Sequence, residues 1–203
     1  EPELASSFCV GRNTVREAVR TLVAYGILEI RRPEGTFVCR TFKPQTINPL
    51  IYSMILQKKE SYQDLIGLRQ CIEFGTLQVI MDQGLNPEDA ENLRQIAVSI
   101  ERELDEPNPD PKLLCRTDIA FHDAIAKATR NDLIVTVNEM LSKLTYGSRI
   151  RTIEQCIREQ DRKYLVDIHF EILKILEDRD TDAIAHTLKR SYSYWANLQM
   201  EEE

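Results

Sequence analysis

Strand-like sequence is confined to one short stretch of this chain, and that restriction decides which folds are open to it. Residues 27–31 (ILEIR) and 36–40 (TFVCR) are rich in β-branched and apolar side chains, and Pro33, Glu34 and Gly35 between them supply turn chemistry. Beyond residue 47 the apolar residues recur at helical spacing instead. The sequence therefore predicts a mainly α protein with one small β-hairpin.

Two helices are predicted ahead of the hairpin. Residues 3–8 (ELASSF) have the composition of a short helix, and Val10 and Gly11 follow as a turn. Residues 12–25 form a second helix, and Gly26 ends it as glycine often does directly after a helix. The order helix, turn, helix and hairpin is that of a winged helix-turn-helix, whose second helix lies in the major groove of DNA.

The second predicted helix has one basic face and one apolar face. Arg12, Arg16 and Arg20 follow one another at intervals of four, so they share a side of the helix. Val15 and Val19 lie on another side, which can pack into the domain. Arginine is informative here because its planar fork binds guanine edges and phosphates. The alternative is a solvated basic helix of some other α-domain, and the hairpin that follows argues against it.

The charge of the chain is distributed unevenly. The formal net charge of all 203 residues is −7. Residues 1–40 hold six Arg and five Glu, a net charge of +1, whereas the remaining residues hold 20 basic and 28 acidic side chains, a net charge of −8. The acidity of the whole chain therefore does not exclude DNA binding by its first segment.

The rest of the chain is predicted to be a linker and an all-helical domain. We assign residues 41–60 to a linker and a linking helix, and residues 61–203 to an antiparallel helical bundle. The breaks between its helices carry turn residues, as in PNPDP at 107–111. The predicted helices cover residues 48–58, 62–83, 87–105, 111–128, 133–150, 160–178 and 182–200.

Composition excludes several classes of protein. No window approaches eighteen uninterrupted apolar residues, so we expect no membrane span. The five cysteines are odd in number, widely spaced and without a CxxC pair, which argues against a disulfide framework and favours a reducing cytoplasm. We find no nucleophile–base arrangement and no phosphate loop, so we do not expect an enzyme.

The three histidines, His122, His169 and His186, point to a second site. Asp118 and His122 are four residues apart and share a helix face. In a helical hairpin that turns near residue 180, equal rise along both helices places Ser191 opposite His169. An Asp–His pair with a further His across a hairpin fits a metal pocket inside a bundle, with His186 facing elsewhere. The simpler alternative for His122 is a core histidine satisfied by Asp118.

The first segment resembles the winged helix of the GntR family of bacterial regulators. The resemblance lies in the ELA helix, the R-x-T-V-R-E-A-x-R-x-L helix that starts at Arg12, the GILEI strand and the GTFV wing. It implies a homodimer that reads a two-fold operator in double-stranded DNA. Because the family's first helix precedes ELA, we expect residues 1–40 to be a truncated winged helix that lacks it. The residues that the resemblance places at DNA are Arg12, Thr14, Arg16, Arg20, Arg32 and Gly35.

Residues from about 61 to 198 resemble the FCD effector domain of the FadR subgroup of GntR regulators. The matching motifs are L-R-x-x-I-E-x-G-T from residue 68, D-x-x-F-H from residue 118 and H-x-x-I-L-x-x-L from residue 169. The resemblance implies one divalent metal, zinc or nickel, held by Asp118, His122 and His169. It also implies a small carboxylate effector, a sugar acid or hydroxy acid, that contacts Arg69 and Ser191.

Ser191 departs from the family pattern, which usually has His at that position. A serine hydroxyl is a weak ligand for zinc or nickel, so we expect a weakened site, although three protein ligands can still hold a metal. Glu73, four residues after Arg69, is expected to fix that arginine. Tyr146 and Arg149 are weaker candidates for the pocket.

These features favour a cytoplasmic, ligand-responsive transcription regulator, either a repressor or an activator. One alternative is a helical-bundle metalloenzyme that uses Asp118, His122 and His169. Another is a regulator without a metal, in which Arg69 and polar groups alone bind the effector. The winged helix separates a regulator from the enzyme, because the enzyme has no use for it.

Overall fold

The computed structural model describes residues 2–39 and 61–193, and the chain divides into two compact units, residues 1–58 and 59–203. The linking helix predicted for residues 48–58 lies outside the described residues, as does the end of the helix predicted to reach residue 200. None of the described helices is long and apolar enough to cross a membrane.

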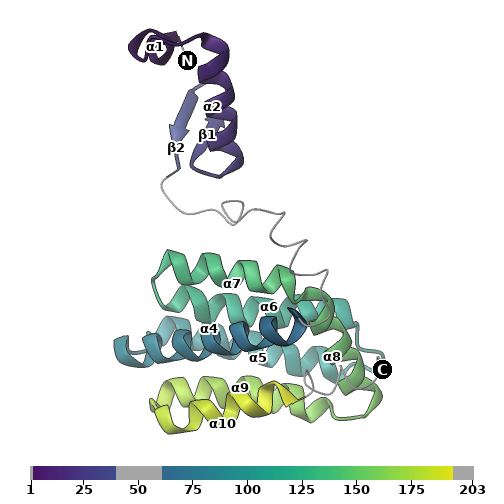
Figure 1. Cartoon of the computed structure of the whole chain (residues 1–203). Coiled ribbons are helices and arrows are strands. Elements are labelled where there is room, and N and C mark those ends of the chain that lie inside the picture. Colours follow the sequence, from purple (N-terminus) through teal and green to yellow (C-terminus); the bar gives the residue numbers. More distant parts are fainter. Residues whose placement is uncertain (1, 40–60, 194–203) are drawn as a thin grey trace. The chain divides into compact units, whose positions relative to one another are not determined.

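The N-terminal unit has the predicted order of elements (Figure 1): α1 (Pro2–Ser7), α2 (Arg12–Ala24), β1 (Leu28–Arg31) and β2 (Gly35–Val38). The strands pair antiparallel, with Arg31 opposite Gly35. Gly26 has a φ of 69°, a left-handed conformation that favours glycine, and it turns the chain from α2 into β1.

The core of this unit is small. Ala5, Val15 and Val19 are buried together, and Val23 and Leu28 pack against them. The apolar face of α2 therefore packs inward, as its spacing predicts.

The second unit is a bundle of helices (Figure 1), in which α6 contacts α4, α5, α7 and α8. Its core is apolar, and the side chains of Phe121, Ile172 and Ile184 are each 0% exposed. Together with the hairpin of the first unit, it gives the mainly α fold that the sequence predicts. The bundle helices are α4 (Ser61–Gln83), α5 (Pro87–Asp105), α6 (Pro111–Ala128), α7 (Asp132–Leu144), α8 (Tyr146–Arg158), α9 (Arg162–Asp178) and α10 (Thr181–Ser191).

Short polar side chains begin four of these helices. Asn86, Asp110, Asn131 and Asp180 each accept a hydrogen bond from a backbone N–H in the first turn of the helix that follows. These caps satisfy donors that have no partner within the helix, so the predicted breaks before α5, α6, α7 and α10 coincide with the observed ones.

One predicted helix, residues 133–150, is wrong: the structure has two helices there, and the second continues to Arg158. The hydroxyl and the N–H of Thr145 both donate to the carbonyl of Leu141, at 2.7 and 2.9 Å, which closes α7. The carbonyl of Thr145 then accepts from the N–H of Arg149 and begins α8. Because apolar residues continue on both sides of Thr145, the pattern gives no sign of this break.

We predict that Ile172→Ala lowers the free energy of unfolding of the bundle by about 2–5 kcal/mol, because it opens a cavity at a position that is 0% exposed. The matched control is Leu133→Ala at a position that is 54% exposed, which should change stability by no more than about 0.5 kcal/mol. Denaturant unfolding followed by circular dichroism measures both. Equal effects of the two variants would contradict the assignment of Ile172 to the core.

Candidate metal and effector site

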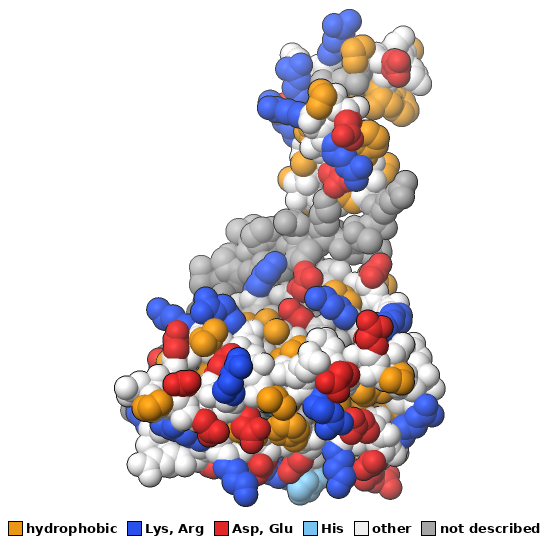
Figure 2. Space-filling view, turned by 180° about the vertical axis from the view of Figure 1, so that it is seen from behind, with side chains coloured by type: hydrophobic (Ala, Val, Ile, Leu, Met, Phe, Trp, Pro, Cys, Tyr) orange, Lys and Arg blue, Asp and Glu red, His pale blue; other side chains and the backbone are white. Residues whose placement is uncertain are grey.

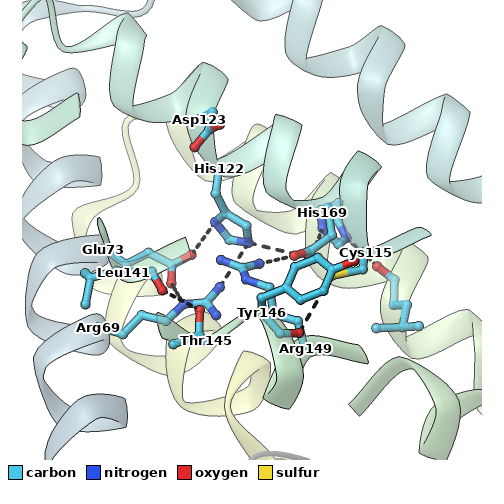
Figure 3. Close-up of polar contacts among 12 residues, drawn as sticks. Arg69, Glu73, Cys115, His122, Asp123, Leu141, Thr145, Tyr146, Arg149 and His169 are labelled. Atoms are coloured by element: carbon cyan, nitrogen blue, oxygen red, sulfur yellow. Dashed lines mark hydrogen bonds and ion pairs between the residues drawn. The ribbon is translucent and has the colours of Figure 1, made fainter. Parts of the chain in front are cut away.

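Asp118, His122 and His169 lie together inside the bundle. Each offers a ligand atom, and these atoms all lie within 4.8 Å of one another. Asp118 and His122 are one turn apart on α6, and His169 comes from α9. Oδ1 of Asp118 is 3.1 Å from Nε2 of His169 and 3.8 Å from Nε2 of His122. One oxygen of Asp118 therefore faces both imidazoles, those of His122 and His169, which Figure 3 labels.

The other nitrogen of each imidazole faces an acceptor. Nδ1 of His169 lies 2.6 Å from the carbonyl oxygen of Leu165, and Nδ1 of His122 lies 3.1 Å from Oε1 of Glu73. Because these oxygens only accept, each Nδ1 carries the hydrogen, and a neutral ring leaves the lone pair of Nε2 pointing toward Asp118. Burial lowers the pKa of His122, which keeps its ring neutral.

This donor set fits a divalent cation. Two imidazole lone pairs and a carboxylate oxygen gather around one point, and such groups repel one another unless positive charge lies among them. Glu73 and the Leu165 carbonyl stand behind the two rings, where the outer partners of metal-bound histidines stand. Asp118, His122 and His169 are thus the residues that would hold the ion.

Arg149 borders the same point from α8. Its guanidinium forms an ion pair with Oδ2 of Asp118, the carboxylate oxygen that does not face the imidazoles. Arg149 is 4% exposed, whereas Tyr146, the other weak candidate, is 40% exposed and lines neither cavity of the site. Both residues lie on α8, which begins directly after the break at Thr145 and carries Arg149 inward.

Arg69 borders the point from α4. It is 6% exposed, and its Nη2 lies 3.5 Å from Nε2 of His122. Its Nε is 3.9 Å from Glu73, as the spacing predicts, and its guanidinium lies over the ring of Tyr192 at 5.5 Å. The hydroxyl of Tyr192 donates to Glu73 at 2.5 Å. Arg69 is therefore held from several sides.

Both carboxyl groups of the site are ionised. Burial alone would raise the pKa of Glu73, but His122, Arg69 and the Tyr192 hydroxyl outweigh it and lower that pKa to about 2. Burial also opposes ionisation of Asp118, but the guanidinium of Arg149 outweighs it and holds the pKa of Asp118 well below the usual range. The two arginines balance the two carboxylates, so a divalent cation would bring positive charge that the chain does not neutralise.

Two small cavities meet at this site. The larger, about 40 Å³, is lined by Asp118, His169 and Ser191 among others, and the smaller, about 20 Å³, lies toward α4 and α7. The hairpin of α9 and α10 thus brings Ser191 to the same cavity as His169, while His186 is exposed on the surface. The side chains that line both cavities are Arg69, His122 and Arg149.

The residues predicted to face DNA lie in the other unit. Those on α2 are exposed on the side away from Val15 and Val19, and Arg20 pairs with Glu17 at 2.7 Å. Arg32 and Gly35 are exposed in the hairpin. Figure 2 shows several basic side chains close together on this unit, whereas basic and acidic side chains are interspersed on the visible face of the bundle.

Sequence reasoning missed Tyr192 as part of the site and underrated Arg149. Tyr192 reaches Glu73 across 119 positions of sequence, and no local pattern reports such a contact. A usable signal was its place next to Ser191, at the end of a helix already assigned to the site.

Comparison with known proteins gives matches to both units. Residues 1–38 match the family described as "Bacterial regulatory proteins, gntR family", and residues 64–193 match the FCD domain. The chain is 30% identical to the HTH-type transcriptional regulator LutR of Bacillus subtilis over 70% of this chain and 62% of that protein. It is 31% identical to the "Putative L-lactate dehydrogenase operon regulatory protein" of Escherichia coli over 66% of this chain and 51% of that protein.

The chain spans less than two thirds of the length of these relatives. A solved structure, Streptococcus agalactiae GntR, has the same fold, with a TM-score of 0.59 at 22% identity, covering 93% of this chain and 85% of that chain. Since the FCD match alone takes in more than half of the sequence and the GntR match precedes it, the chain belongs to the GntR family of bacterial regulatory proteins and carries an FCD domain.

Proposed function

We propose that this chain acts as a DNA-binding transcription regulator whose FCD domain senses a small organic acid beside a divalent metal. The cluster of Asp118, His122 and His169 in the bundle, bordered by two arginines, carries the proposal. The relatives are transcription regulators, and one is named for an L-lactate dehydrogenase operon. No observation favours the alternative of a metalloenzyme.

The N-terminal unit supplies the DNA contacts in this proposal. The N-terminal half of α2 would lie in the major groove, and the hairpin would act as the wing on a two-fold operator bound by a homodimer. The exposure of every predicted contact residue supports this placement, because such a residue must reach bases or phosphates without disturbing the core. These residues are Arg12, Thr14, Arg16, Arg20, Arg32 and Gly35.

We predict that Arg16→Ala in the full-length regulator weakens operator binding without unfolding the protein, because Arg16 is exposed. A two-pronged contact with guanine contributes about 1–3 kcal/mol, so affinity should fall about tenfold or more. Fluorescence anisotropy at one fixed salt concentration measures this, with Arg102→Ala, an exposed arginine of the bundle, as the control. Unchanged affinity would remove Arg16 from the interface.

In the bundle, Asp118, His122 and His169 would hold zinc or nickel, with Ser191 as a weak neighbouring donor. A bound cation of this kind supplies positive charge that anchors a carboxylate. The chain's own part is to fix the ligands: Glu73 and the Leu165 carbonyl orient the two imidazoles.

We predict that Ser191→His raises zinc affinity by about tenfold or more, since position 191 lines the cavity of His169 and an imidazole is a far better ligand than a hydroxyl. Competition with a chromophoric chelator measures the affinity. His186→Ala is the matched control, and it should bind zinc as the unmodified chain does because His186 is exposed away from the site. No gain from Ser191→His would argue against zinc at this point.

The effector in this proposal is a small carboxylate, a hydroxy acid or a sugar acid. With the metal bound, the site carries positive charge that the two chain carboxylates do not balance, and a buried uncompensated charge is costly. Without the metal, Glu73 and Asp118 already balance the arginines, which disfavours the metal-free version of the sensor. The planar fork of Arg69 suits a carboxylate.

We predict that organic acids raise the melting temperature of the zinc-loaded chain and that Arg69→Lys loses most of this shift, because a point charge cannot reproduce a two-pronged contact. Arg116→Lys, at an exposed position of α6, is the control and should keep it. A thermal-shift screen of acids, amines and fatty acids tests this. Stabilisation by amines or fatty acids alone would show the pocket assignment to be wrong, and an acid shift that survives Arg69→Ala would discard the role of Arg69.

A further inference from the structure

Fewer side chains contact the guanidinium of Arg149 than that of Arg69 among the described residues. Its guanidinium pairs with Oδ2 of Asp118, while its buried Nε has no hydrogen-bond partner among the described residues. Arg69, by contrast, has Glu73 on one side, His122 on another and the ring of Tyr192 against its face. If an effector displaces one of the two arginines, these contacts favour the displacement of Arg149, because fewer of them must be broken.

The site must rearrange to admit an organic acid. Cavities of about 40 and 20 Å³ hold a few water molecules at most, and an acid with a carbon chain needs more space. Arg149 lines both cavities, so its movement would join them. One turn further along α8, Thr152 lines the larger cavity, and its buried hydroxyl also lacks a hydrogen-bond partner among the described residues.

Arg149 can leave Asp118 only when another positive charge takes its place beside that carboxylate. Asp118 is ionised inside the bundle, and removing one member of a buried ion pair leaves the other charge uncompensated. Departure of Arg149 therefore requires another positive charge at Asp118, which a divalent cation between Asp118 and the two imidazoles supplies. A cation there also repels both arginines, and a carboxylate next to Arg149 relieves that repulsion.

We propose that Arg149 competes with the divalent cation for Asp118 and turns to the carboxylate of the effector when the cation is bound. This inference rests on the proposed function and adds to it a rule of regulation: metal and acid each raise the affinity of the site for the other. By thermodynamic linkage the two enhancements are equal.

The first test measures zinc affinity by chelator competition. Arg149→Gln should bind zinc about tenfold more tightly than the unmodified chain, because a competitor for Asp118 has been removed. Arg151→Gln, an exposed arginine on the same helix, should leave the affinity unchanged. Equal or weaker zinc binding by Arg149→Gln overturns the proposal, because Arg149 would then only hold Asp118 in place for the metal.

The second test uses L-lactate as the acid and does not depend on a variant that removes a buried charge. L-Lactate should raise the zinc affinity of the unmodified chain about tenfold, within the usual range of coupling between two sites. Arg149→Lys keeps the charge and should keep near-normal zinc binding but lose this enhancement, because it lacks the fork. No enhancement in the unmodified chain, or one that survives in Arg149→Lys, overturns the proposal.

Zinc binding by the unmodified chain and by the variants distinguishes an error in the metal site from an error in the role of Arg149. If the unmodified chain binds no zinc, the proposed metal site is wrong and the role of Arg149 falls with it. If zinc binds and responds to Ser191→His but not to Arg149→Gln, the metal site stands and the competition by Arg149 is wrong.

Discussion

The half-buried carboxylate of Asp118 is the group around which this bundle is organised. A negative charge inside a helical bundle is tolerated only where positive charge and hydrogen-bond donors meet it. Arg149 from α8 pairs with one of its oxygens, and His169 from α9 and His122 from α6 face the other. The helices α6, α8 and α9 thus have a common reason to converge, and the cavities of the site open where they do.

Much of this site follows from spacing alone. Asp118 and His122 are four residues apart, so any helix through them places both on one side. His169 and Ser191 are equally far from the turn between α9 and α10, so an antiparallel hairpin places them together, and they line the same cavity. Both deductions need only the regular rise of a helix, which does not depend on tertiary contacts.

The rest of the site depends on a helix break and a long-range contact, and neither changes the periodic spacing of apolar residues in the sequence. Thr145 ends one helix and starts another through its own backbone and hydroxyl, and the apolar spacing runs through it unbroken. The orientation of Arg149 follows from that break, so the apolar spacing gives no sign that Arg149 faces the site. The contact between Tyr192 and Glu73 joins the last described helix to the first helix of the bundle, and only the packed structure brings them together.

Glu73 also has a mechanical consequence. It lies in the middle of α4, the bundle helix that begins directly after the segment joining the two units. His122 contacts one oxygen of its carboxylate and Tyr192 contacts the other, so side chains from two other parts of the bundle hold α4 at this point. A helix is stiff along its axis, and about twelve residues separate Glu73 from Ser61, a lever of roughly 18 Å. The contacts on Glu73 therefore fix the position of α4 along its axis as far as Ser61, the first residue of the helix.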